Sequence, residues 1–202
     1  MPEEQRHDLT RAAPAINGVS AWEGVAVLAV LEPITKVYRD VFTAPPWNET
    51  DELVDRFVQR LQQECLRPGF MAWTAHDQDG MVGFATGWPT QPPFPGGRSY
   101  TAVANQFGDA WVNRWLVGAM EIDELAVLQR GRGHGVGGRL LGACLQAAPV
   151  KGAWLLTHAH AEATVSFYRR RGWYPPPIPA ADGSGVMIFL SPAHPFTRGN
   201  HR

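Results

Sequence analysis

The sequence is short of cysteine and of long apolar runs. Only two of its 202 residues are cysteines, Cys65 and Cys144, and neither has a Cys or His neighbour at the spacing of a zinc site. A disulfide framework and a structural metal are thereby excluded, and both thiols are expected to be small buried residues. The longest strongly apolar run, Val25–Leu31, is far below the roughly 20 residues that span a bilayer, and no apolar signal region precedes it. We therefore expect a cytoplasmic protein without a membrane partner.

Neither sign of charge is in excess over the whole chain. There are 18 basic and 19 acidic residues, a net charge of −1, which argues against a strongly basic nucleic-acid-binding protein. The total hides an asymmetry, because residues 1–124 hold 9 basic and 17 acidic side chains, whereas residues 125–181 hold 7 basic and 1 acidic. The basic segment is expected to bind an anion, and the acidic segment favours a cationic partner.

The length fits one domain, predicted over residues 20–192, with a loose lead-in over 1–19 and a tail over 193–202. Apolar periodicity predicts strands and helices in mixed order. The expected strands are Val25–Leu31, Phe70–Ala75, Met81–Trp88, Gly118–Leu128, Trp154–Ala159 and Val186–Leu190. The expected helices begin at Pro33, after an N-cap at Asn48, at Val136 and at Ala161. Residues 89–107, which are rich in proline and glycine, are expected to form an irregular functional loop.

A glycine-rich turn lies at the predicted junction of strand 118–128 and the helix that follows it. Five of the eight residues 131–138 are glycines, and Arg130, Arg132 and Arg139 are next to them. Glycine lets a ligand approach the backbone, and the N–H groups that begin a helix bind anions. The simplest alternative is a turn that merely ends the strand. A Walker A loop is excluded because the turn has no lysine, and a dinucleotide site is disfavoured because the turn comes late and no acid follows the next strand.

The residues of this turn carry a resemblance to a known family. Arg130-x-x-Gly133-x-Gly135 is similar to the acetyl-coenzyme A signature [Q/R]-x-x-G-x-[G/A] of the GNAT superfamily, the Gcn5-related N-acetyltransferases. A second segment, residues 163–173, resembles a later motif of that family that ends in F-Y-x-x-x-G-F or a variant with Trp. The resemblance implies the α/β (α+β) GNAT fold: a mixed, mostly antiparallel sheet flanked by helices, with a late β-α-β unit that binds the coenzyme.

The resemblance also assigns coenzyme-binding positions for acetyl-CoA. They are the strand backbone, the turn, the start of the next helix and two positions of the second motif: Leu125, Ala126, Val127, Arg130, Arg132, Gly133, His134, Gly135, Val136, Gly137, Gly138, Ala161 and Tyr168. The chain departs from the family at Ala161, where an Asn often contacts the pantetheine arm, and at Thr164, where Ala is frequent. A missing Asn should cost one hydrogen bond, about 0.5–1.5 kcal/mol.

Acetyl transfer to an amine needs a base, because an amine of the lysine type has a pKa near 10. The acidic residues Glu121, Asp123 and Glu124 precede the turn, and in a regular strand Glu124 points away from the other two. The resemblance places a base at Glu121, which we prefer, with Glu124 as the alternative. It gives Tyr168 the role of proton donor to the thiolate and a strand N–H near Val127 that of oxyanion donor. The simpler interpretations are solvated or paired acids and a tyrosine that only packs.

The sequence thus predicts an N-acetyltransferase that uses acetyl-CoA and acts on a primary amine of a small molecule or peptide. The alternative is a non-catalytic acyl-CoA sensor with the same fold. His158 and His160 alternate at a strand end, but with no third ligand they do not indicate a metal. We expect no metal and no nucleic acid, and the family implies a possible homodimer.

Overall fold

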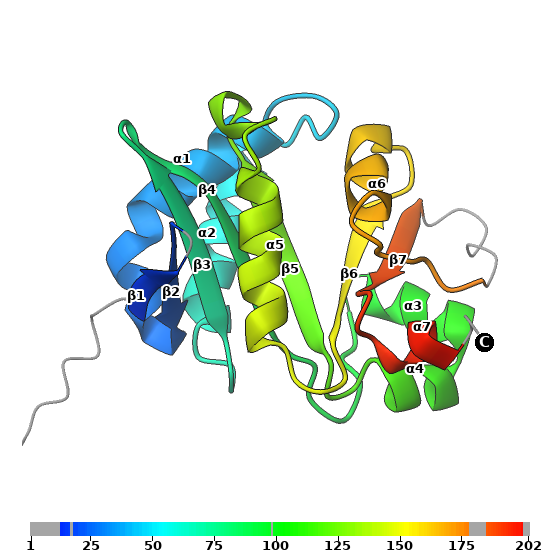
Figure 1. Cartoon of the computed structure of the whole chain (residues 1–202). Helices are drawn as coiled ribbons and strands as arrows, with labels where there is room; N and C mark the ends of the chain where they lie inside the picture. The colour runs from blue at the N-terminus through cyan, green and yellow to red at the C-terminus, as the bar shows by residue number, and fades with distance from the viewer. Residues whose placement is uncertain (1–12, 17, 98, 178–184, 200–202) are drawn as a thin grey trace, which may run out of the picture. The chain divides into compact units, whose positions relative to one another are not determined.

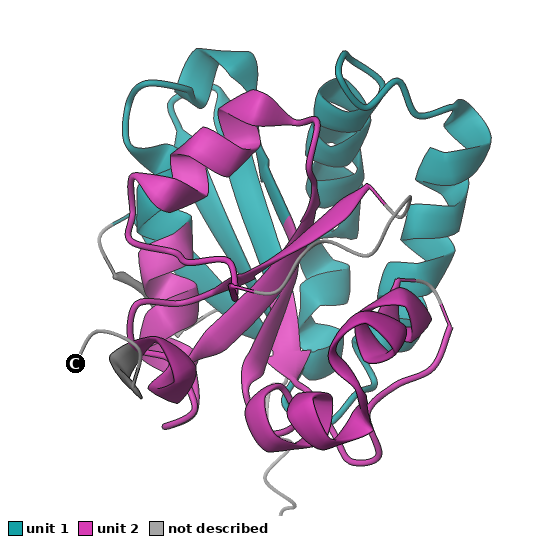
Figure 2. Ribbon diagram, turned by 90° about the vertical axis from the view of Figure 1, so that its right-hand side faces the viewer, with its two compact units in different colours: residues 1–86, 125–140 teal, residues 87–124, 141–202 magenta. Residues whose placement is uncertain are grey.

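The computed structural model describes residues 13–16, 18–97, 99–177 and 185–199. They group into two compact units, each made of two separate stretches of chain (Figure 2). Unit 1 consists of residues 1–86 and 125–140, and unit 2 consists of residues 87–124 and 141–202. Three elements therefore have residues in both units: β4 (Gly80–Pro89), β5 (Met120–Val127) and α5 (Val136–Ala147).

Unit 1 holds the first helices and strands of the chain (Figure 1). Its elements are β1 (Ala13–Ile16), β2 (Val19–Glu23), the 3-10 helix η1 (Gly24–Val30), α1 (Leu31–Phe42), α2 (Asp51–Glu64), β3 (Met71–Asp77), most of β4 (Gly80–Pro89), the end of β5 (Met120–Val127), η2 (Gln129–Gly131) and the start of α5 (Val136–Ala147). β2 pairs antiparallel with both β1 and β3.

Helices cover both faces of β4 in unit 1. Successive side chains of a strand point to opposite faces, so the neighbours Gly83 and Phe84 contact different helices. On one side, Phe84 lies 6.0 Å, between ring centroids, from Phe57 of α2. On the other side, the Cβ position of Gly83 lies 3.2 Å from Leu140 of α5. The predicted stripe of α1 is confirmed, since Ile34, Val37, Tyr38 and Val41 are all buried.

Unit 2 holds the last helices and strands. Its elements are the end of β4, the start of β5, α3 (Tyr100–Phe107), α4 (Asp109–Trp115), the end of α5, β6 (Ala153–His158), α6 (Glu162–Arg169), β7 (Val186–Leu190) and α7 (Pro195–Gly199). β6 pairs antiparallel with β7 along its whole length, from Trp154 with Leu190 to His158 with Val186. β5 pairs with β6 in parallel, and this register covers Met120–Ile122 against Ala153–Leu155. Within this unit the strand order follows the chain order, β5–β6–β7.

The two faces of β6 in unit 2 contact different helices. Trp154 belongs to a buried apolar cluster with Tyr100 and Val103 of α3 and Val112 of α4. Its neighbour Leu155 points to the opposite face, where its strand partner Phe189 lies 5.6 Å from the Tyr168 ring of α6. In this unit α3 and α4 thus cover one face of the strands, and α6 covers the other.

Two glycines of β4 bring its backbone very close to β5. A Cβ at Gly83 would lie 2.8 Å from the carbonyl oxygen of Ala126 in unit 1, and a Cβ at Gly87 would overlap the carbonyl oxygen of Glu121 in unit 2. Cβ atoms are not found at such distances, so neither position accepts a side chain unless the backbone of β5 moves.

The predicted class is confirmed, since strands and helices are mixed and the pairs β1–β2, β2–β3 and β6–β7 are antiparallel. The burial predicted for Cys65 and Cys144 is also confirmed, and both are free thiols. Ala13–Ile16 forms β1 within the segment expected as a lead-in, and residues 1–12 lie outside the described residues. Among the helices of the described ranges, none combines the length and apolarity needed to cross a bilayer.

Three local predictions were wrong. Val25–Leu31 is not a strand: residues 24–30 form η1, because a short apolar run does not distinguish a strand from a helical turn. Asn48 does not cap α2. It has φ of +49°, whereas the cap Thr50 is extended. The segment 89–107 is not irregular throughout, since its prolines and glycines end at Gly97 and residues 100–107 form α3.

Candidate active site

The predicted residues fall into two groups, one in each unit, and each group is described by itself. The end of β5 from Leu125, the turn that follows it and the start of α5 belong to unit 1. The acidic residues at the start of β5 and the helix α6 belong to unit 2.

The turn of unit 1 presents the N-terminus of α5 to solvent. Residues 132–135 are exposed, and α5 begins at Val136. Gly133 and Gly135 have φ of +79° and +77°, values that side-chain-bearing residues rarely adopt. The Arg139 N–H donates to the Gly135 carbonyl over 3.0 Å, which closes the first turn of the helix. The backbone N–H groups that precede Arg139 in α5, including those of Gly137 and Gly138, have no acceptor within the helix. They point out of its N-terminus, which is the positive end of the helix dipole.

Two arginines fold back onto this turn. Arg132 Nε donates to the Val127 carbonyl over 3.2 Å, and Arg139 Nη1 donates to the His134 carbonyl over 3.0 Å. The His134 ring lies on the turn as well, with Nδ1 2.9 Å from the Arg132 carbonyl oxygen. Backbone carbonyls carry no formal charge, so the turn keeps the positive charge of both guanidinium groups. Exposed helix N–H groups and two cations suit a phosphate ligand.

The third arginine has a different partner. Arg130 Nε donates to Asp77 Oδ2 over 2.9 Å, and its Nη2 donates to the Met81 carbonyl over 3.1 Å. The hydrogen bond from Arg130 holds the pKa of the Asp77 carboxyl below its ordinary value. Arg130 thus connects the start of the turn to the β3–β4 hairpin of unit 1, a contact that the sequence did not indicate.

The strand before the turn has a backbone edge that continues beyond its pairing with β6. The parallel register ends at Ile122 with Leu155, whereas β5 continues to Val127. Ala126 is buried, and Leu125 and Val127 are half-buried. Strand N–H and C=O groups are obligatory hydrogen-bonding groups, so this stretch can bind an extended amide chain such as a pantetheine arm.

Glu121 lies on the α3 side of β5 in unit 2. It is paired with Trp154, and only 5% of its surface is exposed. The phenol of Tyr100 donates to Glu121 Oε1 over 2.6 Å. A carboxylate this buried needs hydrogen-bond donors, and Tyr100 supplies one. Sequence analysis missed Tyr100, because it lies in the segment that was expected to be irregular.

Glu124 lies on the other side of β5, as alternation along a strand predicts. It is half-buried, and it interacts electrostatically with Tyr168 of α6. Burial raises the pKa of Tyr168, and the nearby Glu124 carboxylate raises it further. Of the three predicted catalytic residues, the structure therefore brings Glu124 and Tyr168 together and places Glu121 on the opposite face.

Ala161 occupies the N-cap position of α6 and is buried. Its carbonyl accepts from the N–H groups of Thr164 and Val165, but its side chain has no oxygen that could cap the helix or bind a ligand. The departure from the expected Asn thus leaves the first turn of α6 without a side-chain cap.

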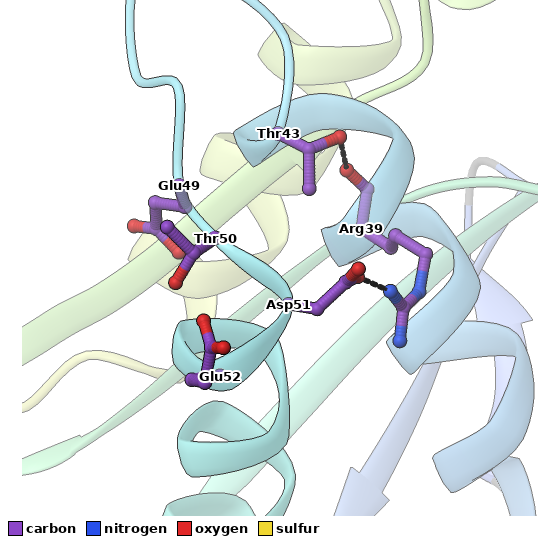
Figure 3. Close-up of a pocket in the computed structure, with 6 residues that line it drawn as sticks. All are labelled: Arg39, Thr43, Glu49, Thr50, Asp51 and Glu52. Carbon is purple, nitrogen blue, oxygen red and sulfur yellow. Dashed lines mark hydrogen bonds and ion pairs between the residues drawn. The ribbon is translucent and has the colours of Figure 1, made fainter.

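Unit 1 also holds a pocket that sequence analysis did not predict (Figure 3). Its lining residues come from the end of α1, the start of α2 and the segment between the two helices: Arg39, Thr43, Glu49, Thr50, Asp51 and Glu52. Arg39 donates to Asp51, and the Tyr38 phenol donates to Glu49 over 2.8 Å. The lining contains three carboxylates and one guanidinium group, so the pocket has a net negative charge.

No cluster of three or more His, Cys, Asp or Glu residues that could bind a metal occurs in the part of the chain that the structure describes. His158 and His160 lie with ring centroids 5.1 Å apart.

Comparison with known proteins gives a consistent result. The model of the acetyltransferase (GNAT) family matches residues 33–173. No curated protein matches the sequence.

Several solved structures share the fold. A protein from Corynebacterium glutamicum described as histone acetyltransferase HPA2 and related acetyltransferase is 19% identical over 90% of this chain and 94% of its own, with a TM-score of 0.55. A GNAT-family acetyltransferase from Bacillus cereus is 14% identical over 88% and 97%, also at 0.55. The PaiA N-acetyltransferase of Thermoplasma acidophilum, solved with coenzyme A, is 14% identical over 86% and 98%, at 0.53.

The matched region contains the glycine turn, β5 and α6, and it makes up well over half of the chain. The chain belongs to the GNAT family of acetyltransferases.

Proposed function

We propose that this acetyltransferase moves the acetyl group of acetyl-CoA to a primary amine by direct attack of the amine on the thioester. The observation that carries the proposal is the glycine turn of unit 1, an exposed helix N-terminus with two arginines directed onto it. It follows the strand that holds the acidic residues. The coenzyme A bound to the PaiA acetyltransferase, which shares the fold, supports the choice of ligand.

The residues of unit 1 would bind the nucleotide end of the coenzyme. The N–H groups at Gly133, Gly135 and Gly137 suit pyrophosphate oxygens, and Arg132 and Arg139 supply the positive charge. Arg130 is directed to Asp77, so its role is to hold the turn and not to bind phosphate. The backbone edge of β5 from Leu125 to Val127 suits the amides of the pantetheine arm.

The acidic and phenolic side chains of unit 2 would perform the proton transfers. Glu121 accepts a proton from the ammonium or attacking amine, directly or through water, and the amine nitrogen attacks the thioester carbonyl carbon. A strand N–H near Val127 stabilises the oxyanion. The carbon–sulfur bond then breaks, and the Tyr168 phenol protonates the thiolate. Its raised pKa keeps it protonated at neutral pH.

Because the amine nitrogen and the thioester sulfur bind the same carbon, this order of events requires the thioester to lie at the edge of β5, beyond its pairing with β6 at Ile122. There Glu121 would act from the α3 face and Tyr168 from the α6 face. Glu124 is the alternative base. It is more accessible than Glu121, but it shares its face with the proton donor. Ala161 offers no side-chain hydrogen bond, which weakens coenzyme binding by one contact.

The acceptor is proposed to be a cationic small molecule or peptide. The acidic balance of residues 1–124 favours such a substrate. Attraction of this kind is screened by salt, so kcat/KM for the amine should fall as ionic strength rises. A cytoplasmic location and a homodimer stay predictions from the sequence and the family.

The test combines binding with turnover. Coenzyme A affinity is measured by calorimetry, and labelled acetyl-CoA is incubated with a panel of small amines, aminoglycosides and peptides. Transfer of label to amines supports the proposal. Tight coenzyme binding without transfer to any amine would favour the acyl-CoA sensor, and absence of binding would refute the role of the turn.

A further inference from the structure

The hydrogen bond between Tyr100 and Glu121 connects a helix that the sequence did not predict to the proposed base. Both side chains are in unit 2, and their oxygens are 2.6 Å apart. Only 4% of Tyr100 and 5% of Glu121 is exposed. The two residues are 21 positions apart in the chain, so the contact depends on where α3 packs.

The Tyr100 ring is held on several sides. The backbone N–H of Tyr100 donates to the Gly97 carbonyl over 3.0 Å at the start of α3. The rings of Phe94 and Trp154 lie edge-on to it, at centroid distances of 5.7 and 6.3 Å. Trp154 is itself fixed, because its Nε1 donates to Thr90 Oγ1 over 2.8 Å. A ring packed in this way directs its hydroxyl at one point, and that point is the Glu121 carboxylate.

The position of Glu121 favours a chemical role for this contact. An ionised side chain in a buried strand costs stability, and an apolar residue would fill the same place without that cost. Glu121 lies opposite Trp154, one residue before the pairing of β5 with β6 ends. A hydrogen-bond donor to one carboxylate oxygen restricts the rotation of the carboxylate and so fixes the direction of its other oxygen.

We propose that Tyr100 is the positioning residue of this enzyme: its phenol fixes the Glu121 carboxylate in the orientation in which it takes the proton of the amine. This inference rests on the proposed function, in which Glu121 is the base. It adds α3 to the elements that determine the rate.

The experiment is a double-mutant cycle in kcat, with Tyr100→Phe, Glu121→Gln and both together. Tyr100→Phe keeps the ring and its packing and removes only the donor. We expect kcat to fall about 10- to 100-fold, the scale of a misplaced catalytic group, with KM for acetyl-CoA unchanged. In the Glu121→Gln background the same substitution should change kcat less than twofold, because no base is left to orient.

The matched control is Tyr38→Phe. It also removes a phenol–carboxylate hydrogen bond, that of Tyr38 to Glu49, but in unit 1. Its kcat should equal that of the wild type. Replacing Tyr100 by 4-aminophenylalanine restores a donor on the same ring and should recover part of the rate. This replacement also serves as the decisive variant if Tyr100→Phe does not fold.

The outcomes separate the two proposals. A wild-type protein that transfers no acetyl group overturns the proposed function, and the role of Tyr100 falls with it. An active wild type with unchanged kcat in Tyr100→Phe overturns the positioning role alone. So does an equal loss in both backgrounds, which would mean that Tyr100 does not act through Glu121.

Discussion

The glycine turn of unit 1 and the Tyr100–Glu121 pair of unit 2 differ in how they are built and in the roles proposed for them. The turn is exposed, offers backbone N–H groups, and consists of residues that are neighbours in the sequence. The pair is buried and consists of two side chains that lie 21 residues apart. The first can be recognised from a short pattern of glycines. The second exists only when a helix packs against a strand.

Because of this difference, substitutions in the two regions should change different quantities. Changes in the turn should alter coenzyme affinity and leave the chemistry of bound complexes intact. Changes around Glu121 should alter kcat and leave coenzyme affinity intact. The following predictions would break this division or make it sharper.

The largest effect is expected for Gly135→Asp in the turn. The substitution puts a carboxylate where phosphate oxygens should bind, at a residue with φ of +77°. A Cβ there would lie 3.4 Å from Arg139 Nη1, so the new acid would also neutralise that arginine. We expect the Kd for coenzyme A, measured by calorimetry, to rise at least about 100-fold, equivalent to about 2.7 kcal/mol.

The matched control is Gly142→Ala in α5, where an added Cβ meets no atom within 4 Å. It should bind coenzyme A like the wild type. If Gly135→Asp also did, the turn would not be the phosphate site.

The next largest effect is expected for Glu121→Gln. Loss of a general base lowers kcat by roughly 10²–10⁴, whereas the Kd for coenzyme A should not change. Glu124→Gln should cost much less. Steady-state kinetics of both variants identify the base, and Glu162→Gln, an exposed acid on α6 of the same unit, is the control. A larger loss in Glu124→Gln than in Glu121→Gln would reverse the assignment.

A smaller loss of kcat, about tenfold, is expected for Tyr168→Phe, since thiolate is a fair leaving group without a proton donor. Burial raises the pKa of Tyr168 above its ordinary value near 10, so the phenol stays protonated as pH rises to 10. The ratio of wild-type to variant kcat should therefore be constant between pH 7 and 10. A ratio that falls toward one near pH 9 would show that Tyr168 ionises in that range and is not so buried in solution.

The smallest effect is expected for Asp77→Asn, which releases Arg130. The ion pair is exposed, and such pairs add little to stability. The melting temperature should not change measurably. Coenzyme affinity should not change either, because Arg130 still donates to the Met81 carbonyl and so continues to hold the turn. A clear gain in affinity would mean that Asp77 competes with phosphate for Arg130.

The sequence predicted those parts of the fold that repeat a local pattern. The α1 stripe was predictable because buried residues recur at helical spacing. The hairpin of β3 and β4 was predictable because two apolar runs flank a short polar turn that ends in Gly80. α3 was not, since its eight residues follow a stretch of prolines and glycines that dominates the composition. The same limit applies to the site. Gly133 and Gly135 are recognisable from neighbours, whereas the partners of Arg130 and Glu121 lie 53 and 21 residues away and depend on packing.

The alternation of side chains along β5 could be predicted in part. The pattern alone predicted that Glu121 and Glu124 point to opposite faces. It did not reveal that one face is covered by Tyr100 and the other by Tyr168, because both helices must be in place before these contacts exist.

The bare backbone of Gly83 and Gly87 in β4 has a consequence for anyone who screens this enzyme by mutation. At these positions even alanine, the usual neutral probe, is too large, and at Gly87 the atom it would displace is the main-chain oxygen of Glu121 itself. An inactive Gly87→Ala protein would thus report a shifted strand and not a lost functional group. The backbone position of β5, which holds the proposed base, therefore depends on the absence of a Cβ atom at both Gly83 and Gly87 of β4.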